Sequence, residues 1–168
     1  MPAVVSDSTP LIYLARLELL SWLRVFYGQV MITNAVWCEV AINGGHLPEG
    51  VAVRKAAAEG WMTVETPGLL AAEFGLDEGE LGAGELEAIL LAKERAAVLV
   101  IDERLGRLKA RHMDIDITGT GGLVLRAKRQ GLIKSVSLEL RLLLSETTFY
   151  MSDDLFAAAL AEAGESEP

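Results

Sequence analysis

Four carboxylates stand beside apolar runs, where an ionised acid is costly to bury. Asp7 and Asp102 each follow a short run of aliphatic residues, whereas Glu39 and Glu85 lie within or at the start of apolar helical stretches. An isolated ionised acid in an apolar setting costs several kcal/mol, so each needs a cation, a proton or a hydrogen-bond donor. Four acids that converge on one cleft would form the ligand set for a hard divalent metal ion.

The elements that must position these acids follow an α/β pattern, because short apolar runs alternate with stretches of helical periodicity. The runs predict strands at 4–5, 30–32, 61–64, 98–101 and 115–118. The periodicity predicts helices at 11–26, 34–42, 51–58, 85–95, 103–112, 121–129, 136–144 and 153–163. The stretch from Thr66 to Gly84 is rich in glycine and acid and is expected to be a loop.

Asp7 and Asp102 are each predicted at the carboxyl end of a strand. In an open parallel sheet, ligands bind beyond that edge. The alternative is that each aspartate caps the helix that follows it. For one aspartate alone, the two interpretations are about equally good, but the shared edge favours a functional pair.

Glu85 and Glu39 are predicted to face inward on their helices. Glu85 shares a helix face with residues that should pack into the core, whereas Glu87 should face solvent. The alternative for Glu85 is a solvent-facing position at a helix N-terminus, which the helix dipole favours. A surface position for Glu39 would expose its neighbour Trp37. Cys38, the only cysteine, is expected to be a small buried hydrophobe.

Carboxylates about 5 Å apart repel each other by roughly 3 kcal/mol per pair at an effective dielectric near 20. Such a cluster needs raised pKa values or a bound cation. Oxygen-only ligands favour Mg²⁺ or Mn²⁺, and the chemistry that follows is metal-assisted hydrolysis.

The distribution of charge supports a phosphodiester substrate. The chain has 15 basic and 24 acidic residues, and the net charge of −9 argues against loose, charge-driven binding to nucleic acid. The segment 104–134 nevertheless carries +6 and follows an acidic stretch. A metal-dependent phosphodiesterase needs acids for the ion and bases for the phosphate backbone. The alternative is a solvated surface that happens to be asymmetric.

The bulk composition predicts one domain at 1–163 and a short, frayed acidic tail at 164–168. Hydrophobic residues make up 51% of the 168, which is typical of a packed globule. No apolar run is long enough to span a bilayer, and the N-terminus lacks the pattern of a signal peptide. A cytoplasmic location and no membrane partner are the default expectations.

Several motifs, in order along most of the chain, carry a resemblance to a known family. They are Val5-Ser6-Asp7-Ser8-Thr9-Pro10-Leu11-Ile12, Val36-Trp37-Cys38-Glu39-Val40, Gly84-Glu85-Leu86-Glu87-Ala88-Ile89, Val100-Ile101-Asp102-Glu103-Arg104, Thr118-Gly119-Thr120-Gly121-Gly122-Leu123 and Ala127-Lys128-Arg129-Gln130-Gly131-Leu132-Ile133. With these motifs the chain resembles the PIN-domain superfamily, and specifically a prokaryotic PIN-like group of the toxin–antitoxin type.

The resemblance implies a three-layer α/β/α sandwich with a central parallel sheet of four to five strands. It also implies an endoribonuclease that depends on Mg²⁺ or Mn²⁺, with Asp7, Glu39, Glu85 and Asp102 as catalytic residues and metal ligands. Supporting roles near the metal are expected for Thr9, Thr118 and Glu103. Many relatives are toxins neutralised by a small antitoxin protein, and many form dimers.

The leading hypothesis is therefore a metal-dependent ribonuclease, the toxin of a toxin–antitoxin pair. Arg104, Arg107 and Lys128 would guide the RNA backbone. The rival hypothesis is a catalytically silent PIN-like module that binds nucleic acid or a protein partner. A nuclease directed at DNA would use the same metal chemistry and is a third hypothesis.

Overall fold

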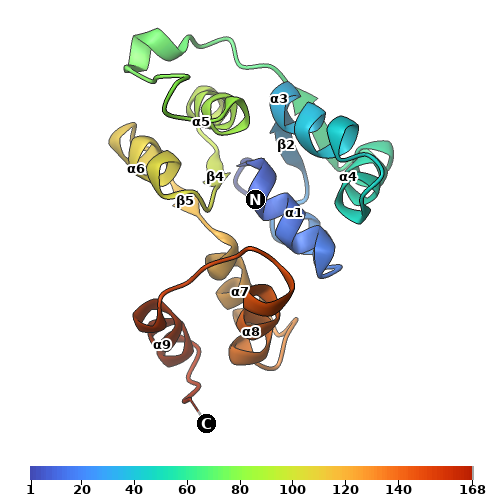
Figure 1. Ribbon diagram of the computed structural model, residues 1–168, viewed down its shortest axis with the longest axis vertical. Coiled ribbons are helices and arrows are strands. Elements are labelled where there is room, and N and C mark those ends of the chain that lie inside the picture. Colours follow the sequence, from blue (N-terminus) through green and yellow to red (C-terminus); the bar gives the residue numbers. More distant parts are fainter. Residues whose placement is uncertain (168) are drawn as a thin grey trace.

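A five-stranded parallel sheet forms the centre of the computed structural model, which describes residues 1–167 (Figure 1). The strands lie in the order β3-β2-β1-β4-β5. Their bounds are Val4–Ser6 (β1), Val30–Thr33 (β2), Met62–Glu65 (β3), Val98–Val100 (β4) and Ile117–Thr118 (β5). Because all neighbouring strands are parallel, the five carboxyl ends lie along one edge of the sheet.

The central strand β1 is buried on both faces, as its continuous aliphatic run predicts. Val5 pairs with Met31 of β2 on one side and with Leu99 of β4 on the other. Asp7 directly follows this strand, so the chain delivers an acid to the middle of the carboxyl edge.

Helices cover both faces of the sheet, so the predicted three-layer α/β/α sandwich is confirmed. Helices α5 (Ala83–Arg95) and α6 (Arg104–His112) pack on one face. The opposite face is covered by α1 (Ser8–Arg16), α2 (Ser21–Tyr27), α4 (Pro48–Ala58) and α7 (Thr120–Arg129). Among residues 1–167, no helix combines the length and apolar character needed to cross a membrane.

The link between β2 and α4 is helical and lies at the carboxyl edge. It consists of α3 (Asn34–Trp37) and a π-helical segment, η1 (Cys38–Asn43), with Gly44 as its C-cap. A π-helical turn inside a longer helix is uncommon and is frequently found at functional sites. This one contains Glu39.

Thr33 caps α3, because Thr33 Oγ1 accepts a hydrogen bond from the Val36 N–H at 3.3 Å. The prediction for Glu87 is wrong in detail. Glu87 does not simply face solvent, because its Oε2 accepts a hydrogen bond from the Ala35 N–H at 3.0 Å. Glu87 thus ties α5 to the start of α3.

The single helix predicted at 11–26 is divided into α1 and α2. Glu18 lies between them with φ 59°, a left-handed conformation that ends a helix. The Leu19 N–H donates to the Leu14 carbonyl at 2.7 Å, which closes the turn. The break lets Leu20 turn into the core.

The long loop predicted between β3 and α5 is confirmed, with one short 3₁₀ helix, η2 (Ala71–Phe74), inside it. At the other edge of the sheet, the strand predicted at 115–118 is shorter. Only Ile117 and Thr118 form strand pairs, with Leu99 and Val100.

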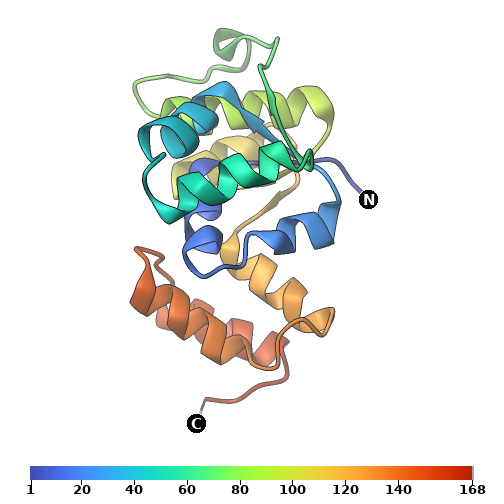
Figure 2. The ribbon, with the colours of Figure 1, turned by 90° about the vertical axis from the view of Figure 1, so that its right-hand side faces the viewer.

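Helices α8 (Val136–Glu146) and α9 (Asp153–Glu162) lie at the end of the long axis opposite η2 (Figures 1 and 2). The predicted fraying of the tail is wrong at Glu165. Its carboxylate accepts hydrogen bonds from the N–H groups of Val136 and Ser137 at 2.8 and 3.0 Å. These bonds hold the pKa of Glu165 at about 2. The last residue of the predicted tail, Pro168, lies outside the described residues.

Candidate active site

Asp7 is a buried carboxylate at the carboxyl end of the central strand. Its backbone N–H donates to the Val100 carbonyl at 3.0 Å, which fixes it beside β4, and the residue is only 2% exposed. Burial raises the pKa of the carboxyl from 3.8 to about 7, although the Ser8 N–H partly opposes this. The nearby charges of the other predicted acids raise this pKa further; these are Glu85, Glu39 and Asp102. The other three predicted acids therefore lie near enough to Asp7 to act on its charge at this edge of the sheet.

Glu39 reaches the site from the π-helical segment. Its Oε2 accepts a hydrogen bond from Ser8 Oγ at 2.7 Å, so the first turn of α1 orients it. Gly84 of α5 packs against both groups: a Cβ at this position would lie 3.2 Å from Glu39 Oε2 and 3.3 Å from Ser8 Oγ. The absence of a side chain at Gly84 therefore lets α5 approach the two polar groups closely.

Glu85 follows Gly84 in the first turn of α5 and is half-buried. Burial raises the pKa of its carboxyl, as do the charges of Glu103 and Glu39, whereas a hydrogen bond from the Gly82 N–H at 3.4 Å lowers it. Each of the two predictions for Glu85, an inward-facing acid or a position at a helix N-terminus, is thus partly correct. Glu85 lies in the first turn of α5 and is also near the other acids.

One hollow of about 330 Å³ joins three of the four acids. It is lined by Asp7, Glu39 and Glu85, together with Thr9 and the thiol-bearing Cys38. The prediction that Cys38 is buried is wrong, because Cys38 is exposed. It begins the π-helical segment, where 3.6-residue spacing no longer tells which side chains face inward.

Asp102 lies at the same edge but is held differently. Its two carboxylate oxygens accept hydrogen bonds from Thr120, one from the backbone N–H at 2.7 Å and one from Oγ1 at 2.6 Å. Burial raises the pKa of Asp102, while the Thr120 bonds and the charge of Arg107 lower it. Asp102 faces a second hollow, of about 440 Å³, which Arg107 and Thr118 also line.

The chemistry of these donors fits a hard divalent cation. The four acids supply only oxygen ligands, and Asp7 is a buried acid that forms no ion pair within residues 1–167. Over the same residues, no three acidic, histidine or cysteine side chains are grouped closely enough to hold a metal ion as they stand. Binding of an ion would therefore require movement of side chains such as that of Glu39, which is exposed.

The three residues predicted to guide RNA differ in how available their charged groups are for contact. Arg107 lines the second hollow, and its Nη1 donates to the Ile101 carbonyl at 2.8 Å. Arg104 is exposed at the start of α6. Lys128 is less available, because its ammonium lies 3.0 Å from the carboxylate of Glu165.

The predicted supporting residues divide between the two hollows. Thr9 lines the first and Thr118 the second. Glu103 caps α6, since its Oε2 accepts a hydrogen bond from the Leu105 N–H at 2.7 Å. Two orienting residues were missed from the sequence: Ser8, whose only signal is its place beside Asp7, and Thr120, which lies in the glycine-rich motif after β5.

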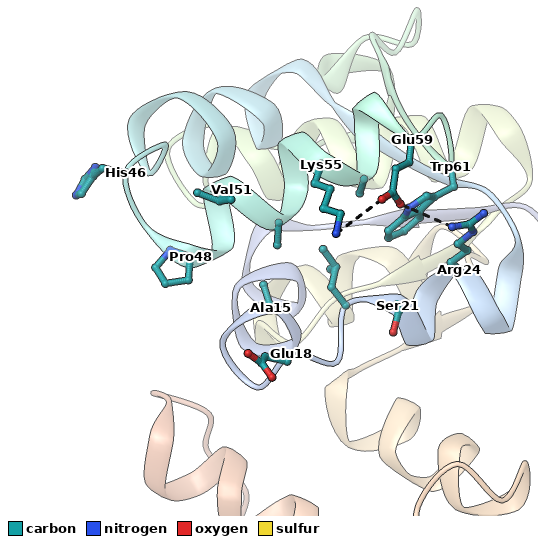
Figure 3. A pocket seen from close by; sticks show the side chains of 13 residues that line it. Ala15, Glu18, Ser21, Arg24, His46, Pro48, Val51, Lys55, Glu59 and Trp61 are labelled. Carbon is teal, nitrogen blue, oxygen red and sulfur yellow. Dashed lines mark hydrogen bonds and ion pairs between the residues drawn. The ribbon is translucent and has the colours of Figure 1, made fainter.

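A hollow of about 610 Å³ lies away from the acids, between α4 and the chain around the end of α1 and the start of α2 (Figure 3). Its charged side chains are largely paired, because Glu59 lies 3.7 Å from Arg24 and 3.9 Å from Lys55. None of the four predicted acids lines it. This hollow is not the candidate active site.

The chain was compared with models of known protein families and with curated proteins. A family model described as a PIN domain matches residues 3–165, which is nearly the whole chain. No curated protein matches the chain.

Proposed function

The chain belongs to the PIN-domain family, and from this premise we propose that it is a metal-dependent endoribonuclease that hydrolyses RNA phosphodiester bonds. PIN domains are generally nucleases, and the fold of this chain is of that type. The proposal adds the substrate, RNA, and the cofactor, Mg²⁺ or Mn²⁺.

One observation carries the proposal: burial and the charges of three acids from separate segments raise the pKa of Asp7 at the carboxyl edge of the sheet. A fold that only needed a helix cap at position 7 would gain nothing from Glu39 and Glu85 nearby. Mutual repulsion of this kind costs stability unless a cation neutralises it. Perturbed carboxylates gathered in a hollow are typical of functional sites.

The residues have distinct roles in this proposal. Asp7, Glu39 and Glu85 would hold the ion at the first hollow, and Asp102 would be the fourth ligand. Ser8 orients Glu39 and Thr120 orients Asp102. When bound, a divalent ion of this kind polarises the phosphoryl group and lowers the pKa of a coordinated water. Arg104 and Arg107 would contact the phosphates of the strand.

The test replaces Asp7 or Asp102 with asparagine, which keeps the size of the side chain and removes its charge. Both variants should lose Mn²⁺-dependent cleavage of single-stranded RNA, and calorimetric titration should show weaker Mn²⁺ binding. Asp116→Asn is the matched control, because Asp116 is exposed and lines neither hollow. Cleavage that persists in both active-site variants would refute the proposal, and parallel digestion of DNA tests the choice of nucleic acid.

We further propose that the chain acts as the toxin of a toxin–antitoxin pair, with a small protein antitoxin as partner, and that it forms a homodimer. The family match is compatible with this role, although the family description names neither a toxin nor an antitoxin. Expression of the chain alone should arrest growth of a bacterial host, and the Asp7→Asn chain should not. Sedimentation of the purified chain measures its oligomeric state.

A second function, a catalytically silent module that binds nucleic acid or a protein, is favoured by one observation. Both oxygens of Asp102 are already engaged by Thr120, so this acid is satisfied without a cation. A silent module should bind no Mn²⁺ in a manner that depends on Asp7. The calorimetric titration therefore separates the two functions.

A further inference from the structure

The hollow beside Asp102 has a chemically mixed lining. Its volume of about 440 Å³ falls within the range of ligand pockets. Asp102, Arg107 and Thr118 contribute polar side chains, and Glu162, which also lines the hollow, is ion-paired with Arg129. Much of the remaining lining comes from α7, from α9 and from the loop between α8 and α9, and is mainly apolar; it includes Leu125, Phe149, Tyr150, Met151 and Leu155.

Tyr150 stands at this hollow with its ring in solvent. The residue is 82% exposed, while its neighbour Phe149 is buried. The loop that carries it is fixed: the Phe149 ring meets the Tyr13 ring edge to face at 5.9 Å, and the Tyr13 hydroxyl lies 3.1 Å from Thr148 Oγ1. Within residues 1–167, the Tyr150 ring has no aromatic or cationic partner.

Contacts to phosphate alone are a weak basis for RNA binding by this acidic chain. Of the basic residues in the segment 104–134, Lys109, Lys128 and Arg129 form ion pairs with glutamates. Arg126 lies over the rings of Phe26 and Tyr27. With a net charge of −9, the chain needs contacts that do not depend on counterion release. Stacking of a base on an aromatic ring is such a contact, and contributes roughly 1–3 kcal/mol per base.

We infer that the hollow beside Asp102 is a subsite for one unpaired nucleotide of the RNA strand, with its base against Tyr150 and its phosphate toward Arg107. This inference rests on the proposed ribonuclease function. Asp102 borders the subsite and also influences Asp7, so a nucleotide held here adjoins the acidic site. A paired base is covered by its stacked neighbours and cannot reach the ring, so the subsite selects single-stranded RNA.

The first test is kinetic and compares Tyr150→Ala with Tyr150→Phe in Mn²⁺-dependent cleavage of single-stranded RNA. Tyr150→Ala should raise KM on the order of tenfold with little change in kcat, because a stacking contact is lost. Tyr150→Phe keeps the ring and should stay within about twofold of the unchanged chain. Leu138→Ala, at an exposed position on α8 that does not line the hollow, is the control.

The second test reports stacking directly, using RNA that contains the fluorescent base 2-aminopurine and the cleavage-deficient Asp7→Asn chain. Binding to the Asp7→Asn chain should quench the fluorescence of the RNA. A chain that carries both Asp7→Asn and Tyr150→Ala should leave the fluorescence unquenched. No quenching in either chain, or equal quenching in both, overturns the inference.

The outcomes separate the inference from the proposed function. Unchanged KM in Tyr150→Ala, with active cleavage, overturns the subsite and leaves the ribonuclease. No cleavage of RNA by the unchanged chain overturns both. Equal cleavage of duplex and single-stranded RNA, or tighter binding of single-stranded DNA than of RNA, also overturns the subsite as stated.

Discussion

Ser8 Oγ donates a hydrogen bond of 2.7 Å to Glu39 Oε2, and the bond joins residues 31 positions apart. The bond connects the first turn of α1 to the π-helical segment after β2. It therefore links the segments that carry Asp7 and Glu39, two of the four predicted acids. Ser8 is buried, which makes the bond hard for water to replace. The orientation of Glu39 therefore depends on a residue that is not itself an acid.

Ser8→Ala should weaken Mn²⁺ binding by about tenfold, which is typical for the loss of a residue that orients a metal ligand. Titration calorimetry measures this directly. Ser21→Ala, at an exposed serine in α2, serves as the control and should bind Mn²⁺ as the unchanged chain does. Equal affinity in Ser8→Ala would mean that Glu39 needs no such support.

Asp7→Asn should stabilise the metal-free chain at pH 8. The pKa of Asp7 is about 7 in the folded chain, whereas an ordinary aspartate, as in the unfolded chain, has a pKa of 3.8. At a pH between these two pKa values, the folded chain therefore binds more protons than the unfolded chain. Its free energy of unfolding therefore falls as the pH rises from about 4 to 7. Asparagine has no charge to bury, so the Asp7→Asn chain avoids this loss of stability. Its free energy of unfolding at pH 8 should exceed that of the wild-type chain by about 2–4 kcal/mol, with little difference at pH 4.

Urea unfolding in the presence of a chelator measures this pH dependence. Asp116→Asn should show no comparable gain, because Asp116 is exposed. If the Asp7→Asn chain is less stable than the unchanged chain at pH 8, the cost of burying the Asp7 charge has been misjudged.

Alkylation of Cys38 should inactivate the proposed nuclease. Cys38 is the only cysteine, it is exposed, and it lines the hollow of about 330 Å³ with three of the acids. A maleimide adduct would fill much of this space, so cleavage should fall at least about tenfold. Cys38→Ala should cleave normally and resist the reagent. Full activity of the labelled chain would place the reaction elsewhere.

Gly119→Ala should reduce cleavage without preventing folding. A Cβ at this position would lie 2.7 Å from both Arg107 Nη1 and Asp102 Oδ1, so one of these groups must move. Overpacking of this kind costs about 1–3 kcal/mol of stability. Cleavage rates and thermal unfolding should be measured together, with Gly68→Ala as control, since its nearest contact would be an ordinary 3.5 Å to Glu94. Cleavage equal to that of the control contradicts a role for the Asp102 edge.

The sequence predicts the sheet well, because buried parallel strands are continuous aliphatic runs and helices have a different period. Asp7 and Asp102 are found at one edge for the same reason: both follow such runs. The break at Glu18 could not be predicted, because a left-handed glutamate has no local signature. Local helical periodicity also misplaced Cys38, because the π-helical segment departs from it.

Contacts between distant segments account for the remaining differences. Thr120 bonds to Asp102 only because β5 lies beside β4, and no spacing along the chain encodes that pairing. Glu165 fastens the start of α8 through a turn formed after α9, where composition alone indicated a frayed tail.

The hydrogen bonds of Glu165 also support one wall of the hollow beside Asp102. The α8–α9 loop lines this hollow, and the carboxylate of Glu165 holds the start of α8 in place. Cleavage of the chain between α9 and Glu165 would remove this support and leave the sheet and the four acids intact. Under the proposed function, a chain clipped there would keep its metal ligands and bind RNA less tightly.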